Sequence, residues 1–166
     1  MVRRAEVGDA LTIARHRAAM FADMGVLHAS VSDTLAQETL AYLEEAIPSG
    51  EYAGWLAADR RQPESVLGGA GVQVRRVLPF PIRETPMPRV GTGRQGTGLN
   101  VYTEPTSRNA GIARLLMGHV IGWAPEAGLE SLVLHASSAG RALYEELGFV
   151  PTNEMRFARS LDSWTL

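Results

Sequence analysis

Apolar residues between Asp9 and Pro48 recur at intervals of three and four positions, which is typical of amphipathic helices. Asp9 can cap a first helix that ends near Gly25 and whose apolar positions are Leu11, Ala14, Ala18 and Phe21. Ser32 or Asp33 can cap a second helix, which Pro48 stops and whose apolar stripe is Leu35, Thr39, Tyr42, Leu43 and Ala46. The first part of the chain therefore predicts two helices in succession.

After Gly50 the apolar pattern changes to that of strands, over residues 51–58 and 65–78, with Gly68, Gly69 and Gly71 as bend points. Residues 79–97 are rich in Pro and Gly and predict a loop, which at this length is usually functional or mobile. The rest of the chain predicts a strand over 99–103, a helix to about Ala127, a strand over 132–135, a helix over 140–147 and strand material from 149 to about 160.

Composition narrows the class of protein. With 166 residues, 45% of them hydrophobic, the chain suits a single domain over 1–166 with a substantial core. A net charge of −2 argues against nucleic acid as a partner. The amino terminus lacks the apolar run of a secretory signal, and no stretch reaches the roughly 18 apolar residues of a membrane span. We therefore expect a cytoplasmic protein with no membrane partner.

Side chains that ligate metals or act as nucleophiles are scarce. Cysteine is absent, so the chain has no disulfide and no thiol nucleophile. The four histidines, His16, His28, His119 and His135, lack the paired spacing of metal ligands, and no metal is expected. His119 follows Leu115 and Leu116 in an apolar helix pattern, so it is predicted to be packed in the interior.

A candidate anion site lies where the strand over 99–103 passes through Pro105 into the next helix. The first N–H groups of a helix have no partner within it and lie at the positive end of its dipole. Ala110, Gly111 and Ala113 have almost no side chain, so backbone can approach a pyrophosphate closely, and Arg108 adds a positive charge. The pattern predicts a phosphate-binding loop over 108–113.

This Arg-x-x-Gly-x-Ala pattern resembles the acyl-CoA pyrophosphate loop of the GCN5-related N-acetyltransferases, the GNAT family. The segment Ala-Leu-Tyr-Glu-Glu-Leu-Gly-Phe, residues 142–149, closely resembles the end of the core of that family, and 151–157 looks like its last strand pair. The resemblance covers nearly the whole chain. It implies the α/β (α+β) GNAT fold, a mixed and strongly twisted sheet of six to seven strands with about four helices on both faces.

The resemblance also implies roles for individual residues. Acetyl-CoA would be the cosubstrate, with its pantetheine amides paired to the backbone of Val101, Tyr102 and Thr103 and its pyrophosphate held by Arg108, Asn109, Ala110, Gly111, Ile112, Ala113 and Arg114. Ser137 stands where family members often carry Asn, and its hydroxyl can still bond the pantetheine arm. Tyr144 matches the tyrosine that protonates the departing thiolate, although a tyrosine on an apolar helix face can equally be a core residue.

The acceptor is expected against the first two helices and the loop over 79–97, the parts that vary among members of the fold. Arg17 places a positive charge in an apolar helix stripe, and burying this charge costs free energy unless a carboxylate or a ligand pairs with it. Either Arg17 forms a structural ion pair, or it recognises an acidic or hydroxylated acceptor beside a wall of Met20, Phe21 and Met24. Glu104 is a candidate to deprotonate the acceptor ammonium, and a solvated carboxylate is the alternative.

The sequence is thus interpreted as an acetyl-CoA-dependent N-acetyltransferase acting by direct attack of a small-molecule amine or a peptide N-terminus. The rival interpretation is a non-catalytic acyl-CoA-binding regulatory or scaffolding module. The acidic residues are spread along the chain, which argues against a basic protein tail as acceptor. The sequence is compatible with a homodimer.

Overall fold

The computed structural model describes residues 1–82, 87–152 and 154–155. The chain falls into two compact units, Met1–His135 and Ala136–Leu166, and each is described by itself below. The prediction of one domain over 1–166 therefore stays a prediction. None of the helices in these described ranges has both the length and the apolar character needed to cross a membrane.

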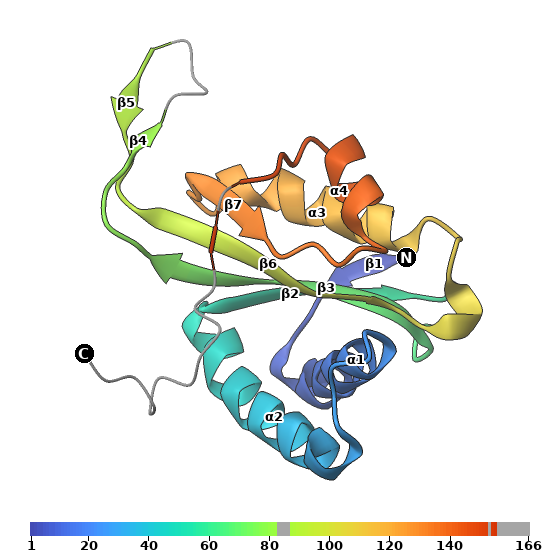
Figure 1. The fold of residues 1–166 in the computed structure, drawn as a ribbon. Helices are drawn as coiled ribbons and strands as arrows, with labels where there is room; N and C mark the ends of the chain where they lie inside the picture. Colours follow the sequence, from blue (N-terminus) through green and yellow to red (C-terminus); the bar gives the residue numbers. More distant parts are fainter. Residues whose placement is uncertain (83–86, 153, 156–166) are drawn as a thin grey trace. The chain divides into compact units, whose positions relative to one another are not determined.

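A five-stranded mixed sheet forms the centre of the first unit (Figure 1). Its strand order is β1-β2-β3-β6-β7, and every neighbouring pair is antiparallel except β6 and β7, which run parallel. The strands are β1 (Val2–Arg4), β2 (Tyr52–Ala58), β3 (Val66–Arg76), β6 (Arg94–Thr103) and β7 (Ser131–Leu134).

Helices cover both faces of this sheet, as Figure 1 shows. On one face lie α1 (Ala10–Asp23) and α2 (Ser32–Ser49), which share a core with Tyr52 and Leu56 of β2. On the other face lies α3 (Ile112–Glu126), whose Trp123 meets Trp55 edge-on at 5.1 Å between ring centroids. Short 3₁₀ turns are η1 (Val7–Asp9), η2 (Ala29–Val31) and η3 (Pro105–Ser107).

The predicted stripe of the first helix is wrong in detail. Ala14 is buried as predicted, but Leu11 is 67% exposed, and the other buried residues of α1 are Ala10, Ile13 and His16. His16 belongs to the buried face because its ring contacts Tyr102 and Glu104 at the end of β6, which are partners that the helix pattern alone does not reveal. Asp9 precedes α1, but its carboxylate binds Arg3 rather than an amide of the first turn.

The other helices match their predicted positions more closely. α2 runs through Pro48 to Ser49 and ends at Gly50, which has a φ of 77°. α3 buries Leu116, Met117, Val120 and Ala124, so that His119 is exposed and the prediction of a packed histidine there is wrong. The buried face of α3 runs through Leu116 and Val120. His119 precedes Val120 by one residue and therefore lies outside this face.

The segment 79–97 is not a plain loop. It contains a separate two-stranded hairpin of β4 (Pro81–Ile82) and β5 (Arg89–Val90), and β6 already begins at Arg94. The main sheet therefore has five strands in the described ranges, against the six to seven expected. Of the expected closing strand over 149–160, residues 149–152 and 154–155 are described without strand structure, and 153 and 156–160 lie outside the described residues.

Candidate functional site

Strand β6 carries a bulge in its middle. Gly69 pairs with Tyr102 and Gly71 pairs with Leu99, so β6 has one residue more than β3 between these two pairs. Asn100 sits at this point with a φ of 55°, in the left-handed region that few residues other than glycine adopt. The bulge interrupts the ladder and places both Leu99 and Asn100 toward α1 and α2, where Leu99 packs on the core and Asn100 meets Arg17.

The far edge of β6 is open beyond this bulge. β7 pairs with β6 only from Gln95 to Gly98, where Leu134 is the last partner. Over 99–103 the opposite edge of β6 has no strand partner in the described part of the chain. Unpaired backbone N–H and C=O groups on a strand edge can pair with an extended chain of amides.

At the end of β6 the chain turns into the start of α3 through exposed backbone. Asn109 and Gly111 both have positive φ, at 61° and 76°, and Gly111 caps the helix. Leu115 donates to the carbonyl of Gly111 at 3.0 Å, so the amides that begin the helix precede its first hydrogen bond. A Cβ built on Gly111 would meet no atom within 4 Å, and the backbone there faces open space.

The two arginines of this loop lie differently. Arg108 turns back toward β6: its Nε donates to the carbonyl of Thr103 at 3.2 Å and its guanidinium pairs with Asp23 of α1. Arg114 is exposed in the first turn of α3. The open edge over 99–103 and the helix start over 109–113 therefore follow one another along the chain, as an anion carrying an amide arm requires.

Glu104 lies between these two features and is held by α1. Its Oε1 accepts from Arg15 at 2.6 Å and lies 3.2 Å from Nε2 of His16. His16 is 1% exposed, and its ring lies at 4.9 Å from that of Tyr102 between centroids, with the two planes tilted by 40°. Burial and the charge of Arg15 lower the pKa of His16, against the opposing effect of Glu104. Glu104 is thus not the solvated carboxylate of the alternative interpretation, and it fixes the end of β6 to α1.

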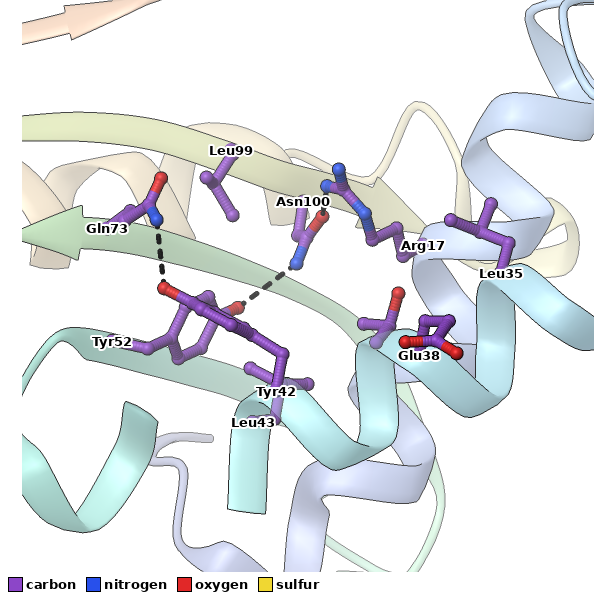
Figure 2. A pocket seen from close by; sticks show the side chains of 10 residues that line it. Arg17, Leu35, Glu38, Tyr42, Leu43, Tyr52, Gln73, Leu99 and Asn100 are labelled. Atoms are coloured by element: carbon purple, nitrogen blue, oxygen red, sulfur yellow. Dashed lines mark hydrogen bonds between the residues drawn. The ribbon is translucent and has the colours of Figure 1, made fainter. Parts of the chain in front are cut away.

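A cavity of about 300 Å³, the Arg17 cavity, lies between α1, α2 and the sheet beside the bulge (Figure 2). Arg17 donates to Asn100 Oδ1 at 2.7 Å, Asn100 Nδ2 donates to Tyr52 Oη at 3.3 Å, and Gln73 donates to Tyr42 Oη at 2.8 Å. The full lining is Arg17, Leu35, Glu38, Thr39, Tyr42, Leu43, Tyr52, Gln73, Leu99 and Asn100.

Of the predicted acceptor residues, Arg17 lines this cavity, and the predicted wall of Met20, Phe21 and Met24 does not. Phe21 lies under the Arg17 guanidinium, at 4.9 Å from the ring centroid, and is not among the lining residues. Met24 is 47% exposed at the end of α1. The lining includes no described residue of 79–97, so the predicted pocket formed by Arg17 with that segment is not found; α2 and the sheet form it instead.

Ser137 and Tyr144 belong to the second unit, which contains α4 (Arg141–Glu146). Ser137 Oγ accepts from the amide of Gly140 at 3.2 Å, at the turn before α4. Tyr144 is half-buried against Phe149, at 6.0 Å between ring centroids, and burial raises its pKa. Within its unit Tyr144 is therefore a protonated phenol, the form that a proton donor needs.

Sequence reasoning missed Asn100, Tyr52 and His16 as members of these sites. Each lies in an ordinary strand or helix pattern, and its partner is 48 to 88 positions away in the chain. The glycines at 54, 69 and 71 were the available signal, because strand glycine marks a close approach as well as a bend.

Comparison with known proteins agrees with this geometry. A family model described as the acetyltransferase (GNAT) family matches residues 21–149. A GCN5-related N-acetyltransferase from Ralstonia eutropha is similar in structure, with 28% identity and a TM-score of 0.81 over 96% of this chain and 97% of that one. A predicted acetyltransferase from Clostridium acetobutylicum, solved with acetyl-CoA, has 26% identity and a TM-score of 0.76 over 98% and 97%.

More distant structures share the fold alone. Glucosamine-6-phosphate N-acetyltransferase from Arabidopsis thaliana has 13% identity and a TM-score of 0.66, over 98% of each chain. No curated protein sequence matches the chain. The family model spans most of the chain, from within α1 to just after α4. The protein therefore belongs to the acetyltransferase (GNAT) family.

Proposed function

We propose that this protein is an N-acetyltransferase that moves the acetyl group of acetyl-CoA to the amine of a small molecule. The observation that carries the proposal is the continuous path along β6, from the bulge at Asn100, along the open edge over 99–103, to the helix start over 109–113. This order matches the chemistry of the cosubstrate, which has a thioester, then amides, then a pyrophosphate. The similar protein solved with acetyl-CoA supports the assignment.

Recognition of acetyl-CoA falls to backbone groups in this proposal. The amide of Thr103 and the carbonyls of Val101 and Thr103 pair with the pantetheine arm as a further strand would, which leaves the amide of Val101 for the reacting carbonyl. The amides of residues 109–113 bind the pyrophosphate at the positive end of α3. Arg108 is already paired with Asp23, so the backbone contributes most of this binding.

Transfer proceeds by direct attack of a neutral amine on the thioester carbonyl, with no covalent enzyme intermediate. Backbone N–H groups near 101–103 stabilise the developing oxyanion, because donors already aimed at it need no reorganisation. The carbon–sulfur bond breaks as the carbon–nitrogen bond forms, and Tyr144 gives its proton to the CoA thiolate. The amine loses its proton to Glu104, directly or through water.

The test is acetyl-CoA binding together with CoA release across a panel of amines. Gly111→Glu places a side chain and a negative charge at a backbone with positive φ, where the pyrophosphate would lie. Calorimetric titration should show acetyl-CoA affinity reduced at least tenfold, since about 1.4 kcal/mol suffices for that factor. Gly118→Ala, in the same helix and with open space around its Cβ, is the matched control and should bind normally.

Two results contradict the proposal in different ways. Unchanged affinity in Gly111→Glu, with the fold intact by circular dichroism, refutes the cosubstrate site. Normal binding of acetyl-CoA with no CoA release for polyamines, aminoglycosides, amino acids and peptide N-termini favours a non-catalytic acyl-CoA-binding module instead.

A further inference from the structure

Arg17 is a half-buried cation without a balancing charge. In the ranges that the structure describes, no carboxylate lies within ion-pair distance of it, and its polar partner is the neutral oxygen of Asn100. Burial lowers the pKa of its guanidinium, because the charged form has lost water. A guanidinium offers five N–H donors and one is used here, so most of its capacity to bind an anion is unspent.

The orientation of Asn100 follows from this contact. A guanidinium can only donate, so the atom of Asn100 that faces Arg17 is the carbonyl oxygen Oδ1. The amide nitrogen of Asn100 therefore faces Tyr52 and donates to its Oη. The Tyr52 hydroxyl accepts this bond through a lone pair, so its own hydrogen is available for another partner. No described residue accepts that hydrogen.

The hydroxyl of Tyr52 keeps that hydrogen at every physiological pH. Its side chain is 3% exposed, and burial raises its pKa to about 12. Tyr42 is in the same position, because its oxygen accepts from Gln73. The wall of the Arg17 cavity thus presents hydrogen-bond donors from Arg17, Tyr52 and Tyr42, among other lining residues (Figure 2).

The rest of the lining decides what kind of anion fits. Leu35, Leu43 and Leu99 provide an apolar surface, and Glu38 of α2 is the acidic residue among those that line the cavity. Glu38 is exposed, so it lies at the solvent side rather than beside the buried donors. A volume of about 300 Å³ is at the lower end for ligand pockets, which suits a compact molecule with one anionic group and an apolar body.

We propose that the amine acceptor carries a carboxylate, which Arg17 and Tyr52 bind, and an apolar side chain, which packs against Leu35, Leu43 and Leu99. The acceptor is thus an amino acid or a close relative. This inference rests on the proposed function, and it narrows the acceptor class of the same reaction.

The experiment compares three forms of the same probe. CoA release is measured with leucine, methionine and phenylalanine, each beside its amide and its decarboxylated amine, at saturating acetyl-CoA. The free amino acid should give a kcat/KM at least tenfold above those of the other two forms, because a charge-assisted hydrogen bond is lost without the carboxylate. Arg17→Met should raise the KM for the amino acid about tenfold and leave that for acetyl-CoA unchanged.

Controls separate recognition from folding. Arg61→Met, on an exposed turn between β2 and β3, removes a positive charge elsewhere and should change neither KM. If Arg17→Met fails to fold, Tyr52→Phe removes a single donor from the same wall. Relative to the wild type, this variant should raise the KM for the amino acid more than it raises the KM for the decarboxylated amine. Equal kcat/KM for the three forms, or an unmoved KM in the folded variants, overturns the carboxylate proposal while acetyl transfer stands. The absence of CoA release with every amine refutes the proposed function, and this inference with it.

Discussion

At the scale of single residues, the glycines of β2 and β3 shape the Arg17 cavity. Gly68, Gly69 and Gly71 of β3 were predicted as bends, yet Gly71 lies in a continuous strand and instead makes room for Tyr52. A Cβ at Gly71 would lie 2.0 Å from Tyr52 Oη and 2.4 Å from its Cζ, and a Cβ at Gly69 would meet His16 Nδ1 at 3.4 Å. The missing side chain at Gly71 thus allows the Tyr52 ring to lie close against the sheet, whereas His16 lies at ordinary contact distance from position 69.

Gly71→Ala should destabilise the protein, because the added methyl group overlaps the buried ring of Tyr52. We expect the free energy of unfolding to fall by about 1–3 kcal/mol, the usual cost of overpacking a core. Chemical denaturation measures the change. Gly118→Ala is the matched control: its Cβ has open space, and alanine favours the helix interior by roughly 1 kcal/mol. Equal stability of the Gly71 variant and the wild type would contradict the packing argument.

At the scale of elements, the ends of strands are held by side chains from elsewhere in the chain. Glu130, beside β7, accepts from Arg89, Thr92 and the amides of Gly93 and Arg94, and so fastens the base of the β4–β5 hairpin. Arg3 of β1 binds both carboxylate oxygens of Asp9 at 2.7 Å, and Asp9 also accepts from the amide of Glu6. The contact between Arg3 and Asp9 joins β1 to the start of α1.

The contact between Arg3 and Asp9 predicts a pH dependence of stability. The hydrogen bond from Arg3 holds the pKa of Asp9 below its ordinary value of 3.8, against the effect of burial. A depressed carboxyl pKa adds stability that is present above the unfolded value and lost as the pH falls through the folded one. Asp9→Asn should therefore cost on the order of 1 kcal/mol at pH 7, and the difference from wild type should shrink below about pH 4.

Unfolding by denaturant at pH 7 and at lower pH measures this difference. Glu64→Gln, on the exposed turn before β3, is the control and should leave the unfolding free energy unchanged at both values. A penalty for Asp9→Asn that is the same at pH 7 and pH 3 would show that the charge of Asp9 does not contribute.

At the scale of the whole molecule, the residues to which the proposal assigns roles lie in two compact units of the chain. The backbone path along β6 and α3 belongs to Met1–His135, and Tyr144 belongs to Ala136–Leu166. The family model extends over residues from both units, which supports a common activity.

Tyr144→Phe tests the role that the family resemblance implies for this residue. Removing a general acid typically costs on the order of 10²–10⁴-fold in rate, so kcat should fall by that factor while acetyl-CoA affinity changes little. Steady-state kinetics and calorimetry give the two values. A kcat within about twofold of wild type would mean that Tyr144 only packs against Phe149 and that water supplies the proton.

Local patterns in the sequence were sufficient for the order of α1 to α4 and of the strands β2, β3, β6 and β7, and they predict the phosphate-binding loop. Helical and strand spacing is a property of neighbouring residues, and the loop over 108–113 joins a strand directly to the helix that follows it. Glycine at 111 is required by its positive φ, which a local pattern can reveal. The family resemblance rested on the same short-range motifs, and the family model confirms it.

The tertiary structure alone decided the Arg17 cavity. Arg17 and Asn100 are 83 positions apart, and Asn100 and Tyr52 are 48 apart, so no window of sequence contains a pair of partners. The bulge at Asn100 depends on the register between β3 and β6, and the burial of His16 depends on its contacts with Tyr102 and Glu104, which are far from it in the chain. Such contacts arise only when the sheet is assembled and its helices pack on it, because hydrogen bonding and close packing act between surfaces that the chain order does not place together.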